Sequence, residues 1–345
     1  MKYGTIETTK SYKYLGFIFT PSGEIVSGLK DLRDRALRAY HKLKHKMGVH
    51  FRLHPFTTMS LFDSLIKPIL LYSSDFWGCL KMPNNNPIQN MYMKFCKALL
   101  GVQKQTANTG VLLELGAVPI MLYGVKNCLK NWHRIHKESK ANSIVLTTHQ
   151  MAINFNLPWP LRTANKLDSL GISPENDIEN IHKVAFEKMK ENFHRESFEE
   201  IRSEHSKLRT YAKLKTEIGM EHYLNSIKNI RDRTALTKIR LSNHTLMIEK
   251  GRHQGLQENQ RLCPFCDDKV ENELHFVIEC STFDVIRQAL FIEMMETDNT
   301  FNLLDDEDKF IFLLSKPEAG KKASEYINKS LQIRNFLVEN PKQNG

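Results

Sequence analysis

Four residues near the C-terminus have the types and the spacing of a metal site. Cys263, Cys266, His275 and Cys280 follow the pattern Cys-x2-Cys-x8-His-x4-Cys. Two thiolates on a tight turn, an imidazole and a third thiolate form a ligand set that binds Zn²⁺ tetrahedrally. Four protein ligands leave no open position for a substrate, so the pattern predicts one structural Zn²⁺ per chain. The alternative is that three cysteines and a histidine fell together by chance.

The residues between these ligands predict the elements that hold them. Pro264 and Phe265 predict a tight turn that directs two cysteine sulfurs to one point. Residues 271–276 predict the start of a short helix that presents His275. The other cysteines lie among apolar residues without a pairing pattern, which predicts buried free thiols in a reducing compartment. These cysteines are Cys79, Cys96 and Cys128.

The composition indicates a globular, basic chain. Its 345 residues allow two or three domains, and 41% apolar residues exclude general disorder. No stretch reaches the ~18 consecutive apolar residues of a membrane span, and the N-terminus lacks the apolar core of a signal peptide. We therefore expect an intracellular protein, cytoplasmic or nuclear, with no membrane partner.

The net charge of +10 is concentrated in two segments. Residues 1–60 and residues 207–252 each contain eleven Lys and Arg against four Asp and Glu. Residues 261–280, around the predicted zinc, contain two basic and five acidic side chains. Because Lys and Arg that neutralise phosphates release counterions, we expect the two basic segments, not the metal loop, to bind nucleic acid.

Apolar spacing predicts a mainly α-helical chain with a short N-terminal β-hairpin. Residues 11–26 alternate aromatic and aliphatic side chains around a Pro-Ser-Gly signal at 21–23, where we expect the hairpin turn. A basic amphipathic helix is expected over residues 27–47, and a helix kinked at Pro68 follows. Further helices are expected over residues 86–101, with Asn86 as its N-cap, and over residues 110–115, 119–136, 144–153, 176–216, 309–314 and 321–336.

Proline, glycine and tryptophan are frequent in residues 154–174, and we place a domain boundary there. Residues 297–308 are acidic and are expected to be irregular.

Four sequence segments, taken in their order along the chain, resemble those of a known protein family. They are YKYLGFIF at 12–19, LFDSLIKPILLYSSDFWG at 61–78, LLELGAVPIMLYGVKNCLKNW at 112–132, and RTALTKIRLSNHTLMIEKGRH with RLCPFC and ENELHFVIEC over 233–280. In this order the chain resembles the sequence that follows the polymerase core in reverse transcriptases of non-LTR (LINE-type) retrotransposons.

The resemblance implies a division into four parts. These are the end of the polymerase palm at 1–26, a helical thumb-like domain at 27–155, a helical basic connector at 156–255, and a CCHC zinc knuckle with flanking C-terminal helices at 256–345. It also implies that Tyr14, Leu15 and Gly16 belong to a hairpin that supports the primer terminus.

The catalytic carboxylates of such a polymerase are not expected in this chain. The family holds two Mg²⁺ ions with an Asp-Asp pair upstream of its Tyr-Leu-Gly segment. Thirteen residues precede Tyr14 here, and Glu7 is their one acidic residue. Two Asp-Asp pairs, at 267–268 and 305–306, lie downstream of the hairpin. We therefore expect no catalytic residue, no bound Mg²⁺ and no polymerase activity of the chain alone.

RNA or an RNA/DNA hybrid is the expected partner of the basic segments. The predicted phosphate-binding residues are Arg33, Arg35, Arg38, Lys42, Lys44 and Lys46 in the first segment and Arg231, Arg233, Lys238 and Arg240 in the second. Each segment has an alternative interpretation. The first helix would then be an ordinary solvated face, and the second a scaffold helix packed on the metal loop.

Other aromatic and histidine residues are interpreted as structural. Tyr211, Tyr223 and Phe276 have rings that stack on bases in other proteins, but we expect them in the core. The histidine pairs at 41 and 45 and at 133 and 136 are expected to be surface residues, because no carboxylate or thiol lies near them in the sequence.

The expected function is that of a C-terminal reverse-transcriptase fragment with sequence-tolerant nucleic-acid binding. Two alternatives remain open. The chain is part of an active RNA-directed DNA polymerase when it is joined to the missing palm and endonuclease, or it is a host-adopted zinc adaptor that binds a protein.

Overall fold

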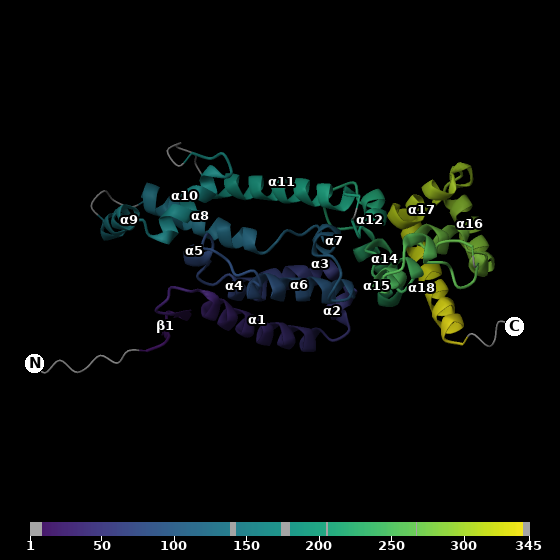
Figure 1. Cartoon of the computed structure of the whole chain (residues 1–345), viewed down its shortest axis with the longest axis horizontal. Helices are drawn as coiled ribbons and strands as arrows, with labels where there is room; N and C mark the ends of the chain where they lie inside the picture. Colours follow the sequence, from purple (N-terminus) through teal and green to yellow (C-terminus); the bar gives the residue numbers. More distant parts are fainter. Residues whose placement is uncertain (1–8, 139–142, 174–179, 205, 267, 341–345) are drawn as a thin grey trace, which may run out of the picture. The chain divides into compact units, whose positions relative to one another are not determined.

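The structure is a computed structural model of the chain, and it describes residues 9–138, 143–173, 180–204, 206–266 and 268–340. Helices dominate this part of the chain, and a short β-hairpin lies near its N-terminal end (Figure 1). The prediction of a mainly α fold is therefore confirmed. Within the described ranges, no helix has both the length and the apolar character needed to cross a membrane.

The helices form two compact units, and neither unit is one continuous stretch of sequence. The first consists of residues 1–48, 59–95 and 118–195, and the second of residues 49–58, 96–117 and 196–345. The predicted divisions at residues 26, 155 and 255 do not coincide with these units. Residues 49–58 and 96–117 fold with the C-terminal part of the chain, and residues 118–195 fold with the N-terminal part.

The elements divide between the units as follows. The first unit contains β1 (Tyr12–Tyr14), β2 (Phe17–Phe19), α1 (Val26–Met47), α4 (Lys67–Leu70), α5 (Ser74–Trp77), α8 (Met121–Glu138), α9 (Ile144–Asn154) and α10 (Pro158–Asp168). The second contains α2 (His50–Leu53), α7 (Asn108–Glu114), α12 (Arg209–Leu214), α13 (Tyr223–Ser226), α14 (Ile230–Arg240), α15 (Met247–His253), α16 (Asp284–Thr297), α17 (Asp306–Ser315) and α18 (Pro317–Glu339). Both units receive residues from α3 (Pro55–Leu65), α6 (Pro87–Leu100) and α11 (Ile181–Arg202).

The hairpin turns earlier than the sequence predicts. β1 and β2 are antiparallel, and Tyr14 pairs with Phe17, so the loop consists of Leu15 and Gly16 alone. Both loop residues have positive φ, 44° and 84°. Two positive φ values are typical of a type I′ turn, whose twist matches that of the strands. The predicted turn at 21–23 lies beyond β2, in the connection to α1.

Two helices match their sequence signals closely. The expected helix at 27–47 is α1, and its buried residues Leu29, Leu32, Ala36 and Tyr40 follow the three- and four-residue spacing of one face. In α6 the side chain of Asn86 accepts a hydrogen bond from the backbone N–H of Ile88 at 2.9 Å, so the predicted N-cap is confirmed.

Other boundaries differ from the prediction for local reasons. The helix expected to kink at Pro68 is two helices, α3 and α4, because a proline cannot donate the hydrogen bond that would continue α3. In α10 the prolines occupy the first turn, where their missing N–H groups cost nothing, so residues 158–168 form a helix inside the predicted boundary. The helix expected over 176–216 is divided between α11 and α12, and its beginning lies outside the described residues. α16 was not predicted.

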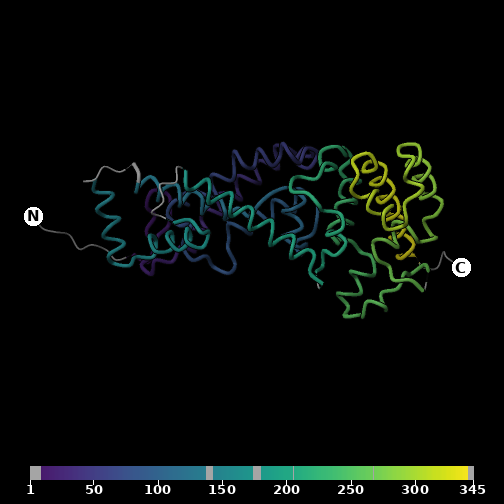
Figure 2. Tube along the Cα trace, turned by 90° about the horizontal axis from the view of Figure 1, so that it is seen from above, coloured from purple at the N-terminus to yellow at the C-terminus, as the bar shows by residue number. Residues whose placement is uncertain are grey.

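Each unit has its own apolar core. In the first unit, Phe62 and Phe95 stack with ring centroids 3.9 Å apart, and Leu129, Trp132 and Phe186 belong to a second cluster. In the second unit, α16, α17 and α18 lie side by side in both views (Figures 1 and 2), and α14 packs on α18. The predicted metal ligands lie in this second unit.

Candidate functional site

The structure brings the four predicted metal ligands together. One ligand atom from each of Cys263, Cys266, His275 and Cys280 lies within 4.8 Å of all the others. The Sγ atom of Cys280 lies 3.9 Å from that of Cys263 and 3.7 Å from that of Cys266. Thiolates bound tetrahedrally at about 2.3 Å from one ion are separated by roughly 3.8 Å, so the sulfur spacing fits a central metal ion. A disulfide would need roughly 2.05 Å.

Two short backbone elements position these ligands. The residues that flank the first two cysteines approach each other as an antiparallel bridge between Leu262 and Val270, and the backbone N–H of Cys263 donates to the carbonyl of Lys269 at 2.7 Å. His275 begins a π-helical turn, His275–Glu279, and its backbone N–H is capped by the side chain of Asn272 at 2.7 Å. The predicted turn and helical presentation of His275 are thus observed.

The imidazole of His275 has one unpaired nitrogen that suits a metal ligand. Its Nε2 atom is buried and has no hydrogen-bond partner in the described part of the chain, whereas Nδ1 lies 3.3 Å from a carboxylate oxygen of Glu279. Metal-binding histidines commonly donate their second nitrogen to a carboxylate, which fixes the ring's tautomer and orientation. The buried Nε2 therefore fits a metal ligand, and Glu279 fits its supporting group.

The thiol of Cys280 lies within hydrogen-bonding distance of the thiols of Cys263 and Cys266. A hydrogen bond from Cys263 lowers the pKa of the Cys280 thiol, although burial opposes that shift. The same bond raises the pKa of Cys263. A lowered pKa favours the thiolate, which is the form of cysteine that binds a metal.

A buried ion pair anchors the metal loop to the C-terminal helix. The guanidinium of Arg334 in α18 donates to both carboxylate oxygens of Glu271, at 2.5 and 2.6 Å. The same carboxylate accepts a hydrogen bond from the backbone N–H of Met247 at 2.6 Å. Tyr326, also in α18, donates its hydroxyl to the carbonyl of Val277 at 2.9 Å. The loop is therefore held by α18 and α15 as well as by its own backbone.

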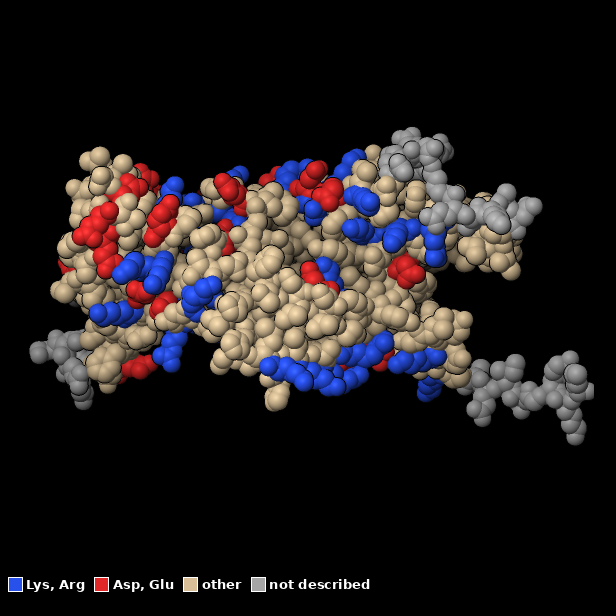
Figure 3. All heavy atoms as spheres, turned by 180° about the vertical axis from the view of Figure 1, so that it is seen from behind, with Lys and Arg blue, Asp and Glu red and all other residues tan. Residues whose placement is uncertain are grey.

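The basic face of α1 is partly exposed. Arg38, Lys42, Lys44 and Lys46 are exposed, and Figure 3 shows basic side chains gathered along the edge of the molecule where α1 lies. A polyanion could therefore reach this part of the helix from solvent.

Two other arginines of α1 are engaged within the first unit. Arg33 pairs with its neighbour Asp34 at 2.7 Å, and Arg35 pairs with Asp31 at 2.9 Å. Arg35 also donates to the carbonyl of Gly16 in the hairpin turn at 2.8 Å. It therefore supports the hairpin, and binding to a phosphate would compete with these bonds.

The predicted primer-supporting hairpin has an exposed tip. Tyr14 and Leu15 are 56% and 72% exposed, and Gly16 is half-buried beside the ring of Tyr72. Tyr72 donates its hydroxyl to the carbonyl of Leu15. Arg35 and Tyr72 thus fix the turn, while the aromatic and aliphatic side chains at its tip face solvent.

Two of the four residues predicted for the second basic surface are buried. Arg231 is exposed and Lys238 is half-buried, but Arg233 and Arg240 are 3% and 0% exposed. Arg233 donates to the carbonyls of Ile227 and Leu53, at 2.7 and 3.2 Å. These two arginines cannot bind phosphate, because α14 is an interior helix of the second unit and their guanidinium groups are used inside it.

Arg240 is the centre of a buried charge network. It donates to both carboxylate oxygens of Glu114 at 2.8 and 3.2 Å, and to Glu221 at 2.7 Å. Tyr223 donates its hydroxyl to Glu114 as well. Sequence reasoning missed this network, although a glutamate within the apolar run VLLEL at 111–115 is a signal that a buried cationic partner exists.

The three aromatic residues that the sequence assigns to the core are buried. Tyr211, Tyr223 and Phe276 are 0%, 5% and 0% exposed, so none offers a ring for base stacking. The assignment of His41 and His45 to the surface is confirmed as well. His133 does not match the prediction of a surface residue, because it is half-buried in the wall of a polar pocket that His182 also lines.

Comparison with known proteins identifies no relative. No protein-family model, no curated protein and no solved structure matches the chain.

Proposed function

We propose that this chain is the C-terminal part of a LINE-type reverse transcriptase that binds RNA or an RNA/DNA hybrid with little sequence preference. The observation that carries the binding proposal is the exposed basic face of α1. The order of the sequence groups from residue 12 to residue 280 supports the family assignment.

We further propose that the ion of the Cys3His cluster is Zn²⁺. Three thiolates and one imidazole form a soft, tetrahedral donor set that suits zinc better than magnesium or calcium. With four protein ligands, the ion has a structural role: it joins the cysteine turn to the π-helical turn that carries His275. The four ligands are neutral or anionic when bound, so the loop itself attracts no phosphate.

Nucleic-acid binding is assigned to α1 on grounds of charge and exposure. Arg38, Lys42 and Lys46 are exposed and make no ion pair within the described ranges. They lie four residues apart along the helix, on a face that a phosphate backbone could follow. Each phosphate that they neutralise releases counterions, whatever the base sequence.

Fluorescence anisotropy of the full-length chain tests this assignment. Replacing Arg38, Lys42 and Lys46 with Gln should weaken binding of a labelled RNA and of an RNA/DNA hybrid. It should also reduce the slope of log affinity against log salt by about 0.7 to 0.9 for each phosphate that is no longer neutralised. The matched control replaces three exposed lysines elsewhere with Gln, namely Lys104, Lys321 and Lys329.

The two variants have the same reduction in formal charge, so a difference between them locates the surface. Equal weakening by both would reject α1 as the binding face. Binding to a protein partner that does not depend on salt, without RNA affinity, would favour the zinc-adaptor alternative.

The proposal includes no polymerase activity of the chain alone. Asp305 accepts a hydrogen bond from the backbone N–H of Asp308 at 2.8 Å and caps α17, which favours a structural role for the pair at 305–306. Asp267, in the other pair, lies outside the described residues. Primer extension on an RNA template with Mg²⁺ tests this part. Extension that appears only when the missing palm is supplied would support the alternative of an active polymerase.

A further inference from the structure

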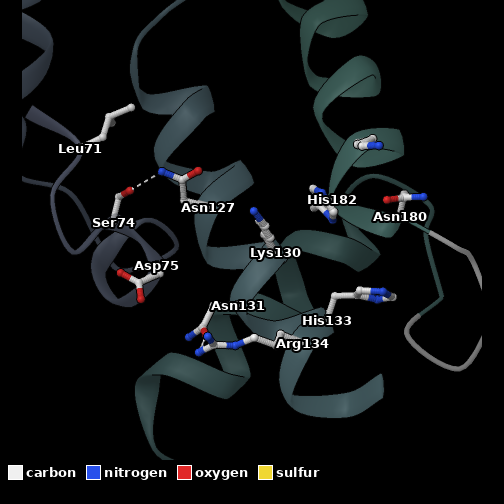
Figure 4. Close-up of a pocket in the computed structure, with 11 residues that line it drawn as sticks. Leu71, Ser74, Asp75, Asn127, Lys130, Asn131, His133, Arg134, Asn180 and His182 are labelled. Carbon is white, nitrogen blue, oxygen red and sulfur yellow. Dashed lines mark hydrogen bonds between the residues drawn. The ribbon is translucent and has the colours of Figure 1, made fainter. Parts of the chain in front are cut away.

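A polar cavity of about 780 Å³ lies in the first unit. Ser74 and Asp75 of α5 line one side, and His182 and Lys183 at the start of α11 line another. The wall between them is α8, as Figure 4 shows. It contributes Asn127, Lys130, Asn131, His133 and Arg134. The volume is within the usual range for small-molecule pockets, roughly 300 to 1,000 Å³.

The described lining of this cavity has a net positive charge, with three cations against one carboxylate. Three exposed basic side chains line the cavity, and none forms an ion pair with any residue that the structure describes. They are Lys130, Arg134 and Lys183. Asp75 is the one carboxylate among the described lining residues, and Leu71 is the one apolar side chain. Three cations gathered around a concave surface repel each other, and a bound anion relieves that repulsion.

Polar atoms in the wall are already arranged by hydrogen bonds. Asn127 donates to the hydroxyl of Ser74 at 2.8 Å, which holds α8 against α5 (Figure 4). Arg134 donates to the side-chain carbonyl of Asn131 at 2.8 Å. That bond uses one nitrogen of a guanidinium that carries five N–H donors, so most of them remain for a ligand.

His182 adds an unsatisfied polar atom at the same place. The residue is 9% exposed, and its Nδ1 atom is buried without a hydrogen-bond partner among the described residues. Its ring centroid lies 6.2 Å from that of His133. Burial, followed by His133 and the nearby lysines, lowers the pKa of His182. Because Nδ1 has almost no accessible surface, a ligand in the cavity would contact other atoms of the His182 ring.

The direction of α11 reinforces the positive potential. α11 begins at Ile181, so the positive end of its dipole lies beside His182 and Lys183. The described first turn contains no acidic residue. Basic side chains at a helix N-terminus are unfavourable by themselves, and an anion in the pocket would offset that cost.

We propose that this pocket of α5, α8 and α11 is a binding site for a phosphate group, carried either by a free nucleotide or by a polynucleotide strand. Lysine, arginine and asparagine donors converge on one concave surface, which suits a group with several anionic oxygens. No Phe, Tyr or Trp is among its described lining residues, so the pocket recognises the phosphate and not the base. The inference is independent of the proposed function, because it concerns a different surface from α1 and requires no family assignment.

Histidine side-chain NMR spectra of the full-length, ¹⁵N-labelled chain test the site directly. The probes are pyrophosphate, ATP and a single-stranded RNA oligomer without terminal phosphates. The test variant is Lys130→Gln with Lys183→Gln, and the matched control is Lys104→Gln with Lys321→Gln. All four lysines are exposed, so neither variant disturbs a core.

We expect saturable shifts of the His133 and His182 signals, at least a tenfold loss of affinity in the test variant and less than a twofold loss in the control. Saturation by pyrophosphate and ATP would identify a free nucleotide as the source, and saturation by the RNA alone would identify the strand. The proposal is overturned if no probe gives saturable shifts, or if both variants weaken binding equally. Because α1 is unchanged in both variants, neither outcome depends on RNA binding by α1.

Discussion

The second unit contains two clusters of buried polar side chains, and they differ in how far apart their members lie in the sequence. The metal centre takes all four ligands from residues 263–280, whereas the Arg240 network joins Glu114, Glu221 and Arg240 from three separate segments. In the first cluster, short backbone elements close in the sequence set the geometry. In the second, the geometry exists only after distant helices have packed.

The two clusters also differ in what completes them. Arg240 and Glu114 satisfy each other, with the guanidinium donating to both carboxylate oxygens. His275 retains a buried Nε2 without a partner among the described residues, so its cluster could accept a metal ion. The metal cluster is therefore open to an added ion, whereas Arg240 and Glu114 already satisfy each other.

Removal of a metal ligand should have the largest effect. Cys266→Ser should abolish stoichiometric zinc binding and remove hydrogen-exchange protection from residues 261–283, because metal binding supplies folding free energy to such a loop, about 10 kcal/mol or more in small zinc modules. Metal analysis of the purified protein and exchange mass spectrometry measure both effects. Cys79→Ser, which changes a cysteine outside the cluster, should keep one ion per chain. Full zinc content in Cys266→Ser would refute the site.

Loss of Arg240 should have the second-largest effect. Arg240→Met leaves the buried carboxylate of Glu114 without its cation, and breaking a buried pair in this way costs about 3–5 kcal/mol. Urea unfolding followed by circular dichroism measures the change in the free energy of unfolding. Arg231→Gln, an exposed change on the same helix, should alter stability by less than about 0.5 kcal/mol.

A second substitution separates the network from a mere packing defect. Adding Glu114→Leu to Arg240→Met should recover most of the stability, because Glu221 keeps its ion pair with Lys215 at 2.5 Å. If the double variant is as unstable as the single one, uncompensated charge is not the cause.

The difference between residues that are close in the sequence and residues that are distant in it explains what the sequence could predict. The metal ligands, the N-cap at Asn86 and the buried face of α1 were all inferred from residues within a few turns of one another. The burial of Arg233 and Arg240 could not be inferred, because the basic and apolar residues of α14 are compatible with a surface helix until its neighbours are known. The pocket formed by α5, α8 and α11 was missed for the same reason: its residues come from segments about 50 residues apart.

A supporting carboxylate should matter less than a ligand. Glu279→Gln removes the charge beside Nδ1 of His275 but leaves all four ligands in place. Changes in such supporting groups lower metal affinity about 10- to 100-fold, and competition with a chromophoric chelator measures this. Glu296→Gln, an exposed change in α16, should leave the affinity unchanged. An unchanged affinity in Glu279→Gln would mean that the ring is oriented by the backbone alone.

The smallest expected effect concerns a locally determined element of the first unit, the hairpin turn. Leu15 has a φ of 44°, which leucine rarely adopts, and asparagine followed by glycine is a preferred type I′ pair. Leu15→Asn should therefore stabilise the first unit by about 0.5–1 kcal/mol, measured by urea unfolding of tryptophan fluorescence. Leu15→Ala removes the same exposed side chain without relieving the backbone. An equal gain from alanine would show that the solvent exposure of leucine, and not the turn conformation, destabilises the wild-type hairpin. The hairpin would then be determined by its hydrogen bonds with Tyr72 and Arg35 more than by its own two loop residues.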